Sequence, residues 1–357
     1  MKRTGAGRSL ITGGAGFLGT NLAHHLLSAG RPVTLYDNLS RAGAEKNLTW
    51  LRRVHGDALD VRVADIRDRF ELRDALHGVS HVYHFAAQVA VTTSLEDPVS
   101  DFEINARGTL NLLEEIRQLG EPPTLIFTST NKVYGGLGDI ALRRNGNRYC
   151  PRDPDIEASG IGEDRVLDFH SPYGCSKGTA DQYVLDYARV YRLPAAVFRM
   201  SCIYGPHQYG TEDQGWVAHF LIRALERQPL TVYGDGKQVR DILYIDDLLE
   251  AFDLAVEHMG LVARHAYNIG GGPANTVSLL ELLELIRNLT GEALQPTFEM
   301  WRTGDQRYYV SDFSRFHAAT GWKPRTRVRK GLGKLHDWLL ESRGLARTHA
   351  AAGRMPA

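Results

Sequence analysis

The first half of the chain alternates short apolar runs with longer amphipathic stretches. The apolar runs predict buried strands at 9–13, 32–37, 61–65, 81–86, 125–130 and 195–200. Apolar positions at helical spacing predict helices between them, at 17–29, 102–119 and 175–191. Strands and helices that alternate in this way indicate a parallel sheet covered by helices on both faces. The sequence therefore predicts an α/β fold with a doubly wound parallel sheet.

The second half is less regular and predicts a smaller α/β lobe that binds the substrate. Its expected strands lie at 230–233, 266–269 and 297–300, and its expected helices at 216–227, 248–257 and 278–289. We predict a first domain at 1–198 and 236–268, a second at 199–235 and 269–345, and a disordered tail at 346–357. The segment 135–170 is rich in Gly, Asp, Arg and Asn and is longer than an ordinary connection, which favours a functional loop or lid.

A glycine-rich loop follows the first predicted strand and opens the first helix. Gly13, Gly16 and Gly19 permit a tight turn, close approach of a pyrophosphate and close helix packing, as in a Rossmann dinucleotide site. Asp37 ends the next strand about twenty residues on, where a carboxylate binds the ribose hydroxyls and repels a 2′-phosphate. NAD is therefore the predicted cofactor, and Arg41 keeps NADP as a lesser alternative. The predicted cofactor-binding residues are Gly13, Gly16, Phe17, Leu18, Gly19, Asp37, Asn38, Ser40, Asp65, Ile66, Phe85, Ala86, Ala87, Thr128, Tyr173 and Lys177.

Tyr173 and Lys177 lie one turn apart on a predicted helix, on the same face. A cation beside a phenol favours the phenolate, so this pair predicts a base that works near neutral pH. Thr130 ends the fifth strand, where ligands of open α/β sheets bind, and its hydroxyl can orient the reacting oxygen. The stretch 233–237 has the same Tyr-x-x-x-Lys spacing, but its glycines indicate a turn without a shared face. We predict that Thr130, Tyr173 and Lys177 are the catalytic residues.

The composition of the chain argues against several classes of function. The 357 residues carry a formal net charge of zero and no long basic run, which argues against nucleic-acid or membrane-surface binding. No segment has the length of uninterrupted apolar residues that a membrane span needs. Cys150, Cys175 and Cys202 cannot all pair and lack metal-ligand spacing, so we expect reduced thiols, no metal and a cytoplasmic protein.

Taken together, these motifs resemble the extended short-chain dehydrogenase/reductase superfamily of nucleotide-sugar epimerases and dehydratases. The resemblance covers residues 8–340 and includes the stretches 233–241 and 302–305. It implies that Arg240 and Arg302 hold the nucleotide diphosphate, a role that suits the forked geometry of guanidinium groups. The substrate-binding residues expected on this basis are Asn131, Lys132, Gln214, Trp216, Arg240, Arg302 and Asp305.

Within this superfamily the chain is most similar to the CDP-tyvelose (CDP-paratose) 2-epimerases, through the stretches 130–135, 168–178, 181–183 and 213–217. The 4,6-dehydratases place an acidic pair after the threonine, whereas this chain has Asn131 and Lys132, which disfavours dehydration. Typical 4-epimerases have Asn at the position of Cys202, so a simple 4-epimerase is also disfavoured.

The resemblance implies transient oxidation at C2 of a nucleotide sugar by tightly bound NAD, with return of the hydride to the other face. Lys177 would lower the pKa of Tyr173 and hold the nicotinamide ribose, while Asn131 and Lys132 would contact the sugar or hold the loop. Another enzyme of the superfamily, such as a 4-epimerase or a reductase, remains an alternative, as does a non-catalytic dinucleotide sensor. A 4,6-dehydratase is a weaker alternative. The helices at 102–119 and 175–191 lie where relatives form a dimer seam, so we expect a homodimer or homotetramer.

Overall fold

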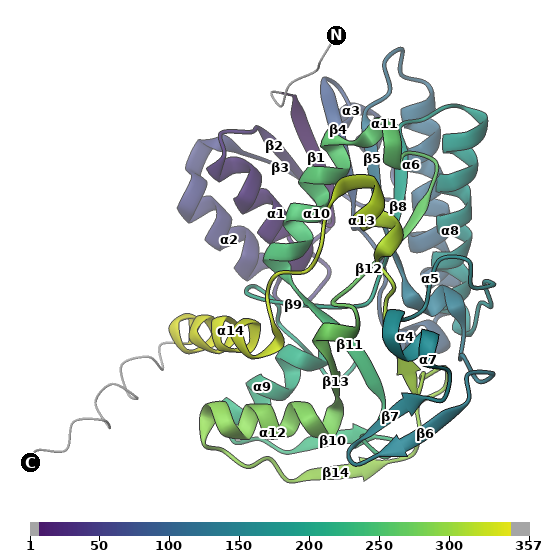
Figure 1. Cartoon of the computed structure of the whole chain (residues 1–357). Helices are drawn as coiled ribbons and strands as arrows, with labels where there is room; N and C mark the ends of the chain where they lie inside the picture. The colour runs from purple at the N-terminus through teal and green to yellow at the C-terminus, as the bar shows by residue number, and fades with distance from the viewer. Residues whose placement is uncertain (1–6, 344–357) are drawn as a thin grey trace, which may run out of the picture.

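The computed structural model describes residues 7–343 (Figure 1), and the predicted tail at 346–357 lies outside them. A parallel sheet of seven strands has the order β12-β8-β5-β4-β1-β2-β3. These strands are β1 (Arg8–Thr12), β2 (Val33–Asp37), β3 (Leu59–Val63), β4 (Val79–His84), β5 (Thr124–Thr130), β8 (Ala195–Met200) and β12 (Ala266–Ile269). This arrangement confirms the predicted Rossmann-type α/β fold. The strand order reverses between β1 and β4, and ligands of such sheets bind at this switch point.

Helices cover both faces of this sheet because successive side chains of each strand point to opposite sides. In β5, Ile126 belongs to a core that also contains buried residues of α1 (Phe17–Ser28), α2 (Ala44–His55) and α10 (Ile245–Glu257). Its neighbours Leu125 and Phe127 belong to the core on the other face, which contains buried residues of α3 (Arg69–Ala75), α6 (Gly108–Arg117) and α8 (Ser171–Val190). Both cores consist of buried aliphatic and aromatic side chains, so burial on two faces explains the continuous apolar strands.

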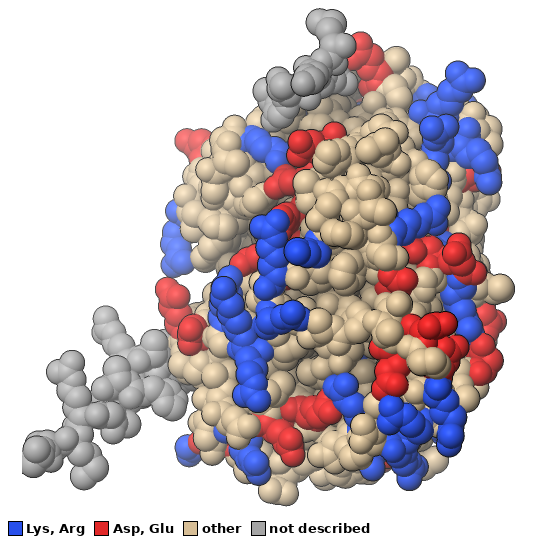
Figure 2. Space-filling model, viewed as in Figure 1, with Lys and Arg blue, Asp and Glu red and all other residues tan. Residues whose placement is uncertain are grey.

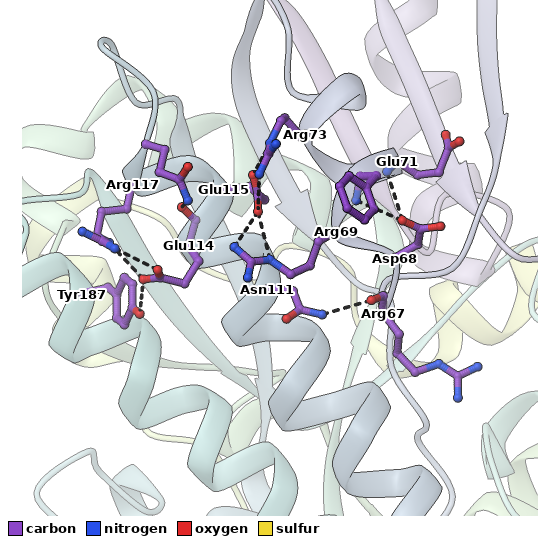
Figure 3. Close-up of polar contacts among 12 residues, drawn as sticks. Arg67, Asp68, Arg69, Glu71, Arg73, Asn111, Glu114, Glu115, Arg117 and Tyr187 are labelled. Carbon is purple, nitrogen blue, oxygen red and sulfur yellow. Dashed lines mark hydrogen bonds and ion pairs between the residues drawn. The ribbon is translucent and has the colours of Figure 1, made fainter.

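Ion pairs tie the helices of the second face together (Figure 3). The Glu115 carboxylate on α6 is buried and accepts from Arg69 at 2.7 Å and Arg73 at 2.8 Å, both on α3. The neighbouring Glu114 accepts from the Tyr187 hydroxyl of α8 at 2.6 Å. These contacts hold α8, which carries Tyr173 and Lys177, against the rest of the layer.

The smaller lobe is built on two further sheets. Strand β11 (Val239–Tyr244) pairs with β13 (Thr276–Ser278), β15 (Tyr308–Tyr309) and β9 (Cys202–Tyr204), and β10 (Leu230–Tyr233) pairs with β14 (Pro296–Glu299). Helices α9 (Trp216–Glu226), α12 (Leu279–Thr290) and α14 (Val328–Ser342) pack against one another beside them. The chain therefore visits the small sheet in β9 and β11 before it returns to the large sheet in β12. The predicted domain boundaries stay a prediction.

The segment 135–170 is not the open loop that its composition indicated. It contains β6 (Leu142–Asn145), β7 (Arg148–Pro151) and α7 (Pro154–Ser159), and we call it the strap. Its Arg148 binds Glu281 of α12 at 2.6 Å, and the carbonyl of Ile161 accepts from the Asn268 amide of β12 at 2.8 Å. The strap therefore bonds to both parts of the molecule. The second bond also gives the Ile161 carbonyl the partner that it would find in water in a free loop.

The remaining elements are short and complete the connections. They are η1 (Gly56–Ala58), α4 (Val91–Glu96), α5 (Pro98–Phe102), the π-helical turn η2 (Glu103–Arg107), η3 (Asn131–Tyr134), α11 (Met259–Val262), η4 (Pro273–Asn275) and α13 (Ser314–Thr320). No helix within residues 7–343 has the length and apolar character to cross a bilayer. Basic and acidic side chains are interspersed over the face shown in Figure 2.

Candidate active site

The glycine loop connects β1 to α1 at the switch point and is shaped by steric limits. Gly13 has φ +67°, and a Cβ there would lie 2.7 Å from the backbone nitrogen of Ala86. A Cβ on Gly19 would lie 2.4 Å from the carbonyl oxygen of Gly13. A Cβ on Gly16 would meet only that same oxygen, at 3.2 Å, so its other side is open. Gly16 is also the N-cap of α1 and has no side-chain cap, which leaves N–H groups of the first turn for a phosphate.

A cavity of about 520 Å³ opens beside this loop. Twelve of the predicted cofactor residues line it: Gly13, Gly16, Phe17, Leu18, Asp37, Asn38, Ser40, Asp65, Ile66, Phe85, Ala86 and Ala87. Gly19 does not line it, because Gly19 serves the packing of α1 on the loop. A cavity that combines a glycine-rich backbone, a carboxylate for the ribose hydroxyls and apolar walls fits a dinucleotide.

The two carboxylates of this cavity differ in their surroundings. Asp37 accepts from the backbone N–H of Ala15 at 2.9 Å and of Leu39 at 2.8 Å, and burial raises its pKa against these bonds. Asp65 lies just beyond β3 and is bound by Arg67 at 2.8 Å, which lowers its pKa. Asn38 donates to Asp65 at 2.8 Å, so both residues shape the cavity wall together.

A second cavity of about 480 Å³ adjoins the first, and both are lined by Phe17, Leu18, Phe85, Ala87 and Gln214. Every predicted catalytic and substrate-binding residue lines this second cavity, as do Thr128, Met200 and Cys202. The predicted residues come from β5, η3, α8, α9, β11 and the loop before β15, so the fold brings together groups far apart in the sequence. The set comprises Thr130, Asn131, Lys132, Tyr173, Lys177, Gln214, Trp216, Arg240, Arg302 and Asp305.

Tyr173 lies in the first turn of α8 and is buried. Its backbone N–H donates to the Ser94 hydroxyl of α4 at 3.2 Å, which fixes the start of the helix. Burial raises the pKa of Tyr173 to about 12. A hydrogen bond with Thr130 and the charge of Arg41 act in the opposite direction, and Asp101 adds to the rise.

The Lys177 ammonium is held by a strand carbonyl, and its predicted effect on Tyr173 stays a prediction. Its Nζ donates to the carbonyl oxygen of Thr128 at 2.7 Å and lies 4.2 Å from the centre of the Phe127 ring. Burial lowers the pKa of Lys177 to about 7, although Asp181 and Asp101 oppose the shift. Thr130, through a hydrogen bond, and Arg41, through its charge, lower the pKa of Tyr173. The strand carbonyl determines where the ammonium points, and side-chain spacing on a helix does not contain that information.

Asn131 and Lys132 connect the end of β5 to the loop before β15. The Asn131 amide donates to Gln306 at 3.0 Å, and the Lys132 ammonium donates to the carbonyl of Gly304 at 3.0 Å. Burial lowers the pKa of Lys132 to about 8, while Asp305, 3.8 Å away, raises it. The two side chains that follow Thr130 therefore hold this loop.

The two predicted phosphate-binding arginines have acidic partners. Arg240 is buried and binds Asp305 at 2.7 Å. Arg302 lies 3.4 Å from both Glu212 and Asp213, and its guanidinium stacks on the Tyr233 ring at 3.8 Å. Tyr233 thus belongs to the substrate cavity, while the glycines after it, at φ +80° and +72°, form the expected turn.

The residues that the sequence analysis missed support the helix beneath the site. Ser176 of α8 donates to Asp101, and Asn105 donates to the same carboxylate at 3.1 Å and to Ser176 at 3.0 Å. Trp216 donates to the Cys202 sulfur at 3.2 Å, which places this cysteine in the substrate cavity wall. Asp101 and Asn105 lie outside every motif, so the sequence carried no signal for them. Ser176 lies within the stretch 168–178, and Trp216 and Cys202 were already singled out from the sequence, but only the structure shows these contacts.

The chain is similar to known proteins along most of its length. Residues 9–270 match the NAD dependent epimerase/dehydratase family. The chain is 42% identical over 342 residues to the CDP-paratose 2-epimerase of Salmonella typhi, covering 92% of this chain and 98% of that protein. It is 31% identical to a probable dTDP-glucose 4,6-dehydratase of Sinorhizobium fredii, over 94% of this chain and 93% of that one.

Among solved structures, a UDP-glucuronic acid 4-epimerase from Bacillus cereus in complex with UDP-glucuronic acid and NAD matches with a TM-score of 0.80. The match has 26% identity and covers 94% of this chain and 99% of the other. The family description and the fit of the glycine cavity agree that NAD is the cofactor. The chain belongs to the NAD dependent epimerase/dehydratase family.

Proposed function

We propose that the chain is a nucleotide-sugar 2-epimerase that acts on CDP-linked sugars of the paratose and tyvelose type. The observation that carries this proposal is the 42% identity to the Salmonella typhi CDP-paratose 2-epimerase, which extends along 98% of that protein. The dehydratase relative is more distant, at 31% identity. The reaction is inversion at C2 by transient oxidation.

Each predicted catalytic residue has a distinct part in this reaction. Tyr173 takes the proton from the C2 hydroxyl and later returns one to the oxygen. Thr130, which shares a hydrogen bond with Tyr173, orients that oxygen. Lys177 is fixed by the Thr128 carbonyl and lines the second cavity, where it would hold the nicotinamide ribose. When bound, NAD supplies the hydride acceptor and donor for C2 and a positive charge that favours the Tyr173 phenolate.

The surroundings of Thr130 support epimerisation over dehydration. Eliminating water from a sugar needs an additional acid and base beside the reacting carbons. The two positions after Thr130 carry an amide and an ammonium, and both are engaged with the loop before β15. Asp305, the carboxylate nearest to Lys132, is bound by Arg240. The two side chains directly after Thr130 therefore include no carboxyl group that could serve as this acid or base.

Arg240 and Arg302 are the proposed contacts of the nucleotide diphosphate, with Gln214 and Trp216 on the wall between them and the cofactor. Diphosphate oxygens compete with carboxylates for guanidinium groups because both offer paired anionic acceptors. We expect the substrate to take Arg302 from Glu212 and Asp213, since this arginine is the more exposed of the two.

The experiment is proton NMR of CDP-paratose, CDP-glucose and UDP-glucose with purified enzyme in heavy water. The proposal expects a change in the H1–H2 coupling of a CDP-sugar without deuterium at any carbon, because the same hydride leaves and returns. Inversion at C4 identifies a 4-epimerase, the second candidate, which the B. cereus structure favours. Deuterium at a neighbouring carbon, or faster turnover of UDP-glucose, also contradicts the proposal.

The proposal also includes an oligomeric state and a cellular location. We propose a homodimer or homotetramer, supported by the exposed side chains of Phe102 on α5 and Tyr183 on α8, two helices that pack together. We place the enzyme in the cytoplasm, since Cys150, Cys175 and Cys202 are all free thiols and reducing compartments preserve them.

A further inference from the structure

Arg41 and Gln214 form a hydrogen bond between the two parts of the molecule. Arg41 lies in the loop after β2, four residues past Asp37, and lines the cofactor cavity. Its Nη2 donates to the side-chain oxygen of Gln214, which lies just before α9 and lines both cavities. The bond therefore joins two segments 173 residues apart at the place where the cofactor and substrate cavities meet.

Gln214 lies in a turn that backbone hydrogen bonds hold in place. The backbone N–H of Thr211 donates to the carbonyl of Gln214 at 2.8 Å, and the reverse bond is 3.3 Å long. Arg302 donates to the carbonyl of Glu212 at 3.1 Å and holds the other side of this turn. One arginine from each part of the molecule thus fixes the turn 211–214.

The charge of Arg41 affects the pKa values of two groups, one in each cavity. It opposes the effect of burial on the pKa of Asp37, the predicted ribose contact, and it also lowers the pKa of Tyr173. Among residues 7–343, the only hydrogen-bond acceptor of the Arg41 guanidinium is Gln214. A guanidinium has five N–H donors, so the others are available to anionic oxygens in the cavity.

We propose that Arg41 is a cofactor-retaining residue, and that its bond to Gln214 closes the cleft while NAD and the oxidised sugar are inside. The second part rests on the proposed function, because only transient oxidation needs the oxidised sugar kept with the cofactor. Loss of either species would leave an enzyme that cannot finish its cycle. The first part, the role of Arg41 in retaining NAD, is argued from the geometry of Arg41 and Gln214 and does not rest on the proposed function.

The test measures NAD release from the purified holoenzyme by dilution, with Arg41→Gln, Gln214→Ala and Gln214→Glu compared with wild type. We expect Arg41→Gln and Gln214→Ala to release NAD up to about tenfold faster, as the loss of a hydrogen bond to a charged group at a partly exposed site predicts. Gln214→Glu replaces the amide by a carboxylate and should slow release. Release from wild type should quicken with salt, and this dependence should weaken in Arg41→Gln.

The matched control is Arg53→Gln, which removes an exposed arginine from α2 in the same lobe. Equal release from this control and from Arg41→Gln would overturn the proposal. If Arg41→Gln fails to fold, Gln214→Ala and Gln214→Glu test the proposal. Unchanged NAD release in both of these variants would overturn it. These measurements need no sugar, so retention can hold even if the NMR experiment rejects C2 epimerisation. During turnover, near-ultraviolet absorbance should reveal reduced cofactor accumulating in Gln214→Ala and not in Arg53→Gln.

Discussion

The phenol of Tyr173 and the ammonium of Lys177 are both buried, and burial moves their proton affinities in opposite directions. It disfavours the charged form of each, so it raises the pKa of Tyr173 to about 12 and lowers that of Lys177 to about 7. At neutral pH the protein's own groups thus keep the phenol protonated and leave the ammonium close to its midpoint. Small changes in local charge decide the state of Lys177.

Replacing Tyr173 by Phe tests the proposed base directly. We expect kcat to fall by about 10²–10⁴, the usual contribution of a positioned acid–base group, with NAD content unchanged. The control is Tyr191→Phe, at the exposed end of α8. A Tyr173→Phe variant with nearly wild-type turnover would exclude this residue as the base. Retained biological function without turnover would favour a dinucleotide sensor.

Lys177 predicts a specific pH dependence of stability. The unfolded lysine holds its proton up to a pH of about 10.4, whereas the folded one releases it near pH 7. The unfolded state therefore binds more protons between these values, so the free energy of unfolding rises with pH through this window. The difference between these pKa values corresponds to a rise on the order of 5 kcal/mol over the whole window.

Urea unfolding at several pH values between about 7 and 9.5 measures this rise. In Lys177→Met the rise should shrink, and the part due to Lys132 should remain. The exposed Lys330→Met variant should follow wild type. Parallel curves for wild type and Lys177→Met would show that the buried ammonium does not titrate in this range.

At the scale of elements, α8 is joined to the sheet and to the turn η3 by a buried polar network. Asp181, one turn after Lys177, binds Arg199 of β8 through two bonds of 2.9 Å. Arg199 also donates to the Tyr134 hydroxyl at 3.2 Å, and Tyr134 donates to Asn268 of β12 at 2.8 Å. The helix that carries the catalytic pair is thus positioned by charges as well as by apolar packing.

Replacing one partner of the Asp181–Arg199 ion pair should lower the free energy of unfolding more than replacing both partners. Arg199→Met leaves the carboxylate of Asp181 buried without its partner, so we expect a loss of about 3–5 kcal/mol in unfolding free energy. The double variant Asp181→Leu/Arg199→Met should recover most of it. Arg189→Met, which breaks the exposed pair with Asp186 on the same helix, should cost less than about 1 kcal/mol. Additive losses in the double variant would mean that the two charges do not depend on each other.

The sequence predicted local elements well and long-range contacts poorly. The strand at 195–200 matched β8, and Thr130 does end β5, because alternating burial leaves a clear apolar pattern. Helices α2 and α14 were missed, since their polar faces are wide and their apolar stripes short. The direction of the Lys177 ammonium and the contact of Arg41 with Gln214 depend on groups distant in the chain, which no local pattern encodes.

At the scale of the whole molecule, the proposed oligomer depends on the exposed face of α5 and α8. Tyr183 is 42% exposed and Phe102 is 47% exposed, and aromatic side chains of this kind are enriched where subunits meet. We expect sedimentation of wild type at twice the monomer mass or more, and a monomer for Tyr183→Glu. Val166→Glu, an exposed position of the strap, is the control. A wild-type monomer would refute the proposed assembly.

The late position of β12 in the chain has a consequence for biosynthesis. Its neighbour β8 is complete at Met200, yet β12 begins only at Ala266, after β9, α9, β10, β11 and α10 have been made. During translation one edge of β8 therefore stays unpaired until β12 has been made. An unpaired strand edge can form hydrogen bonds with a neighbouring nascent chain. A fragment that stops between these two strands keeps that edge permanently. A truncated gene product of this length should aggregate rather than persist as an NAD-binding remnant.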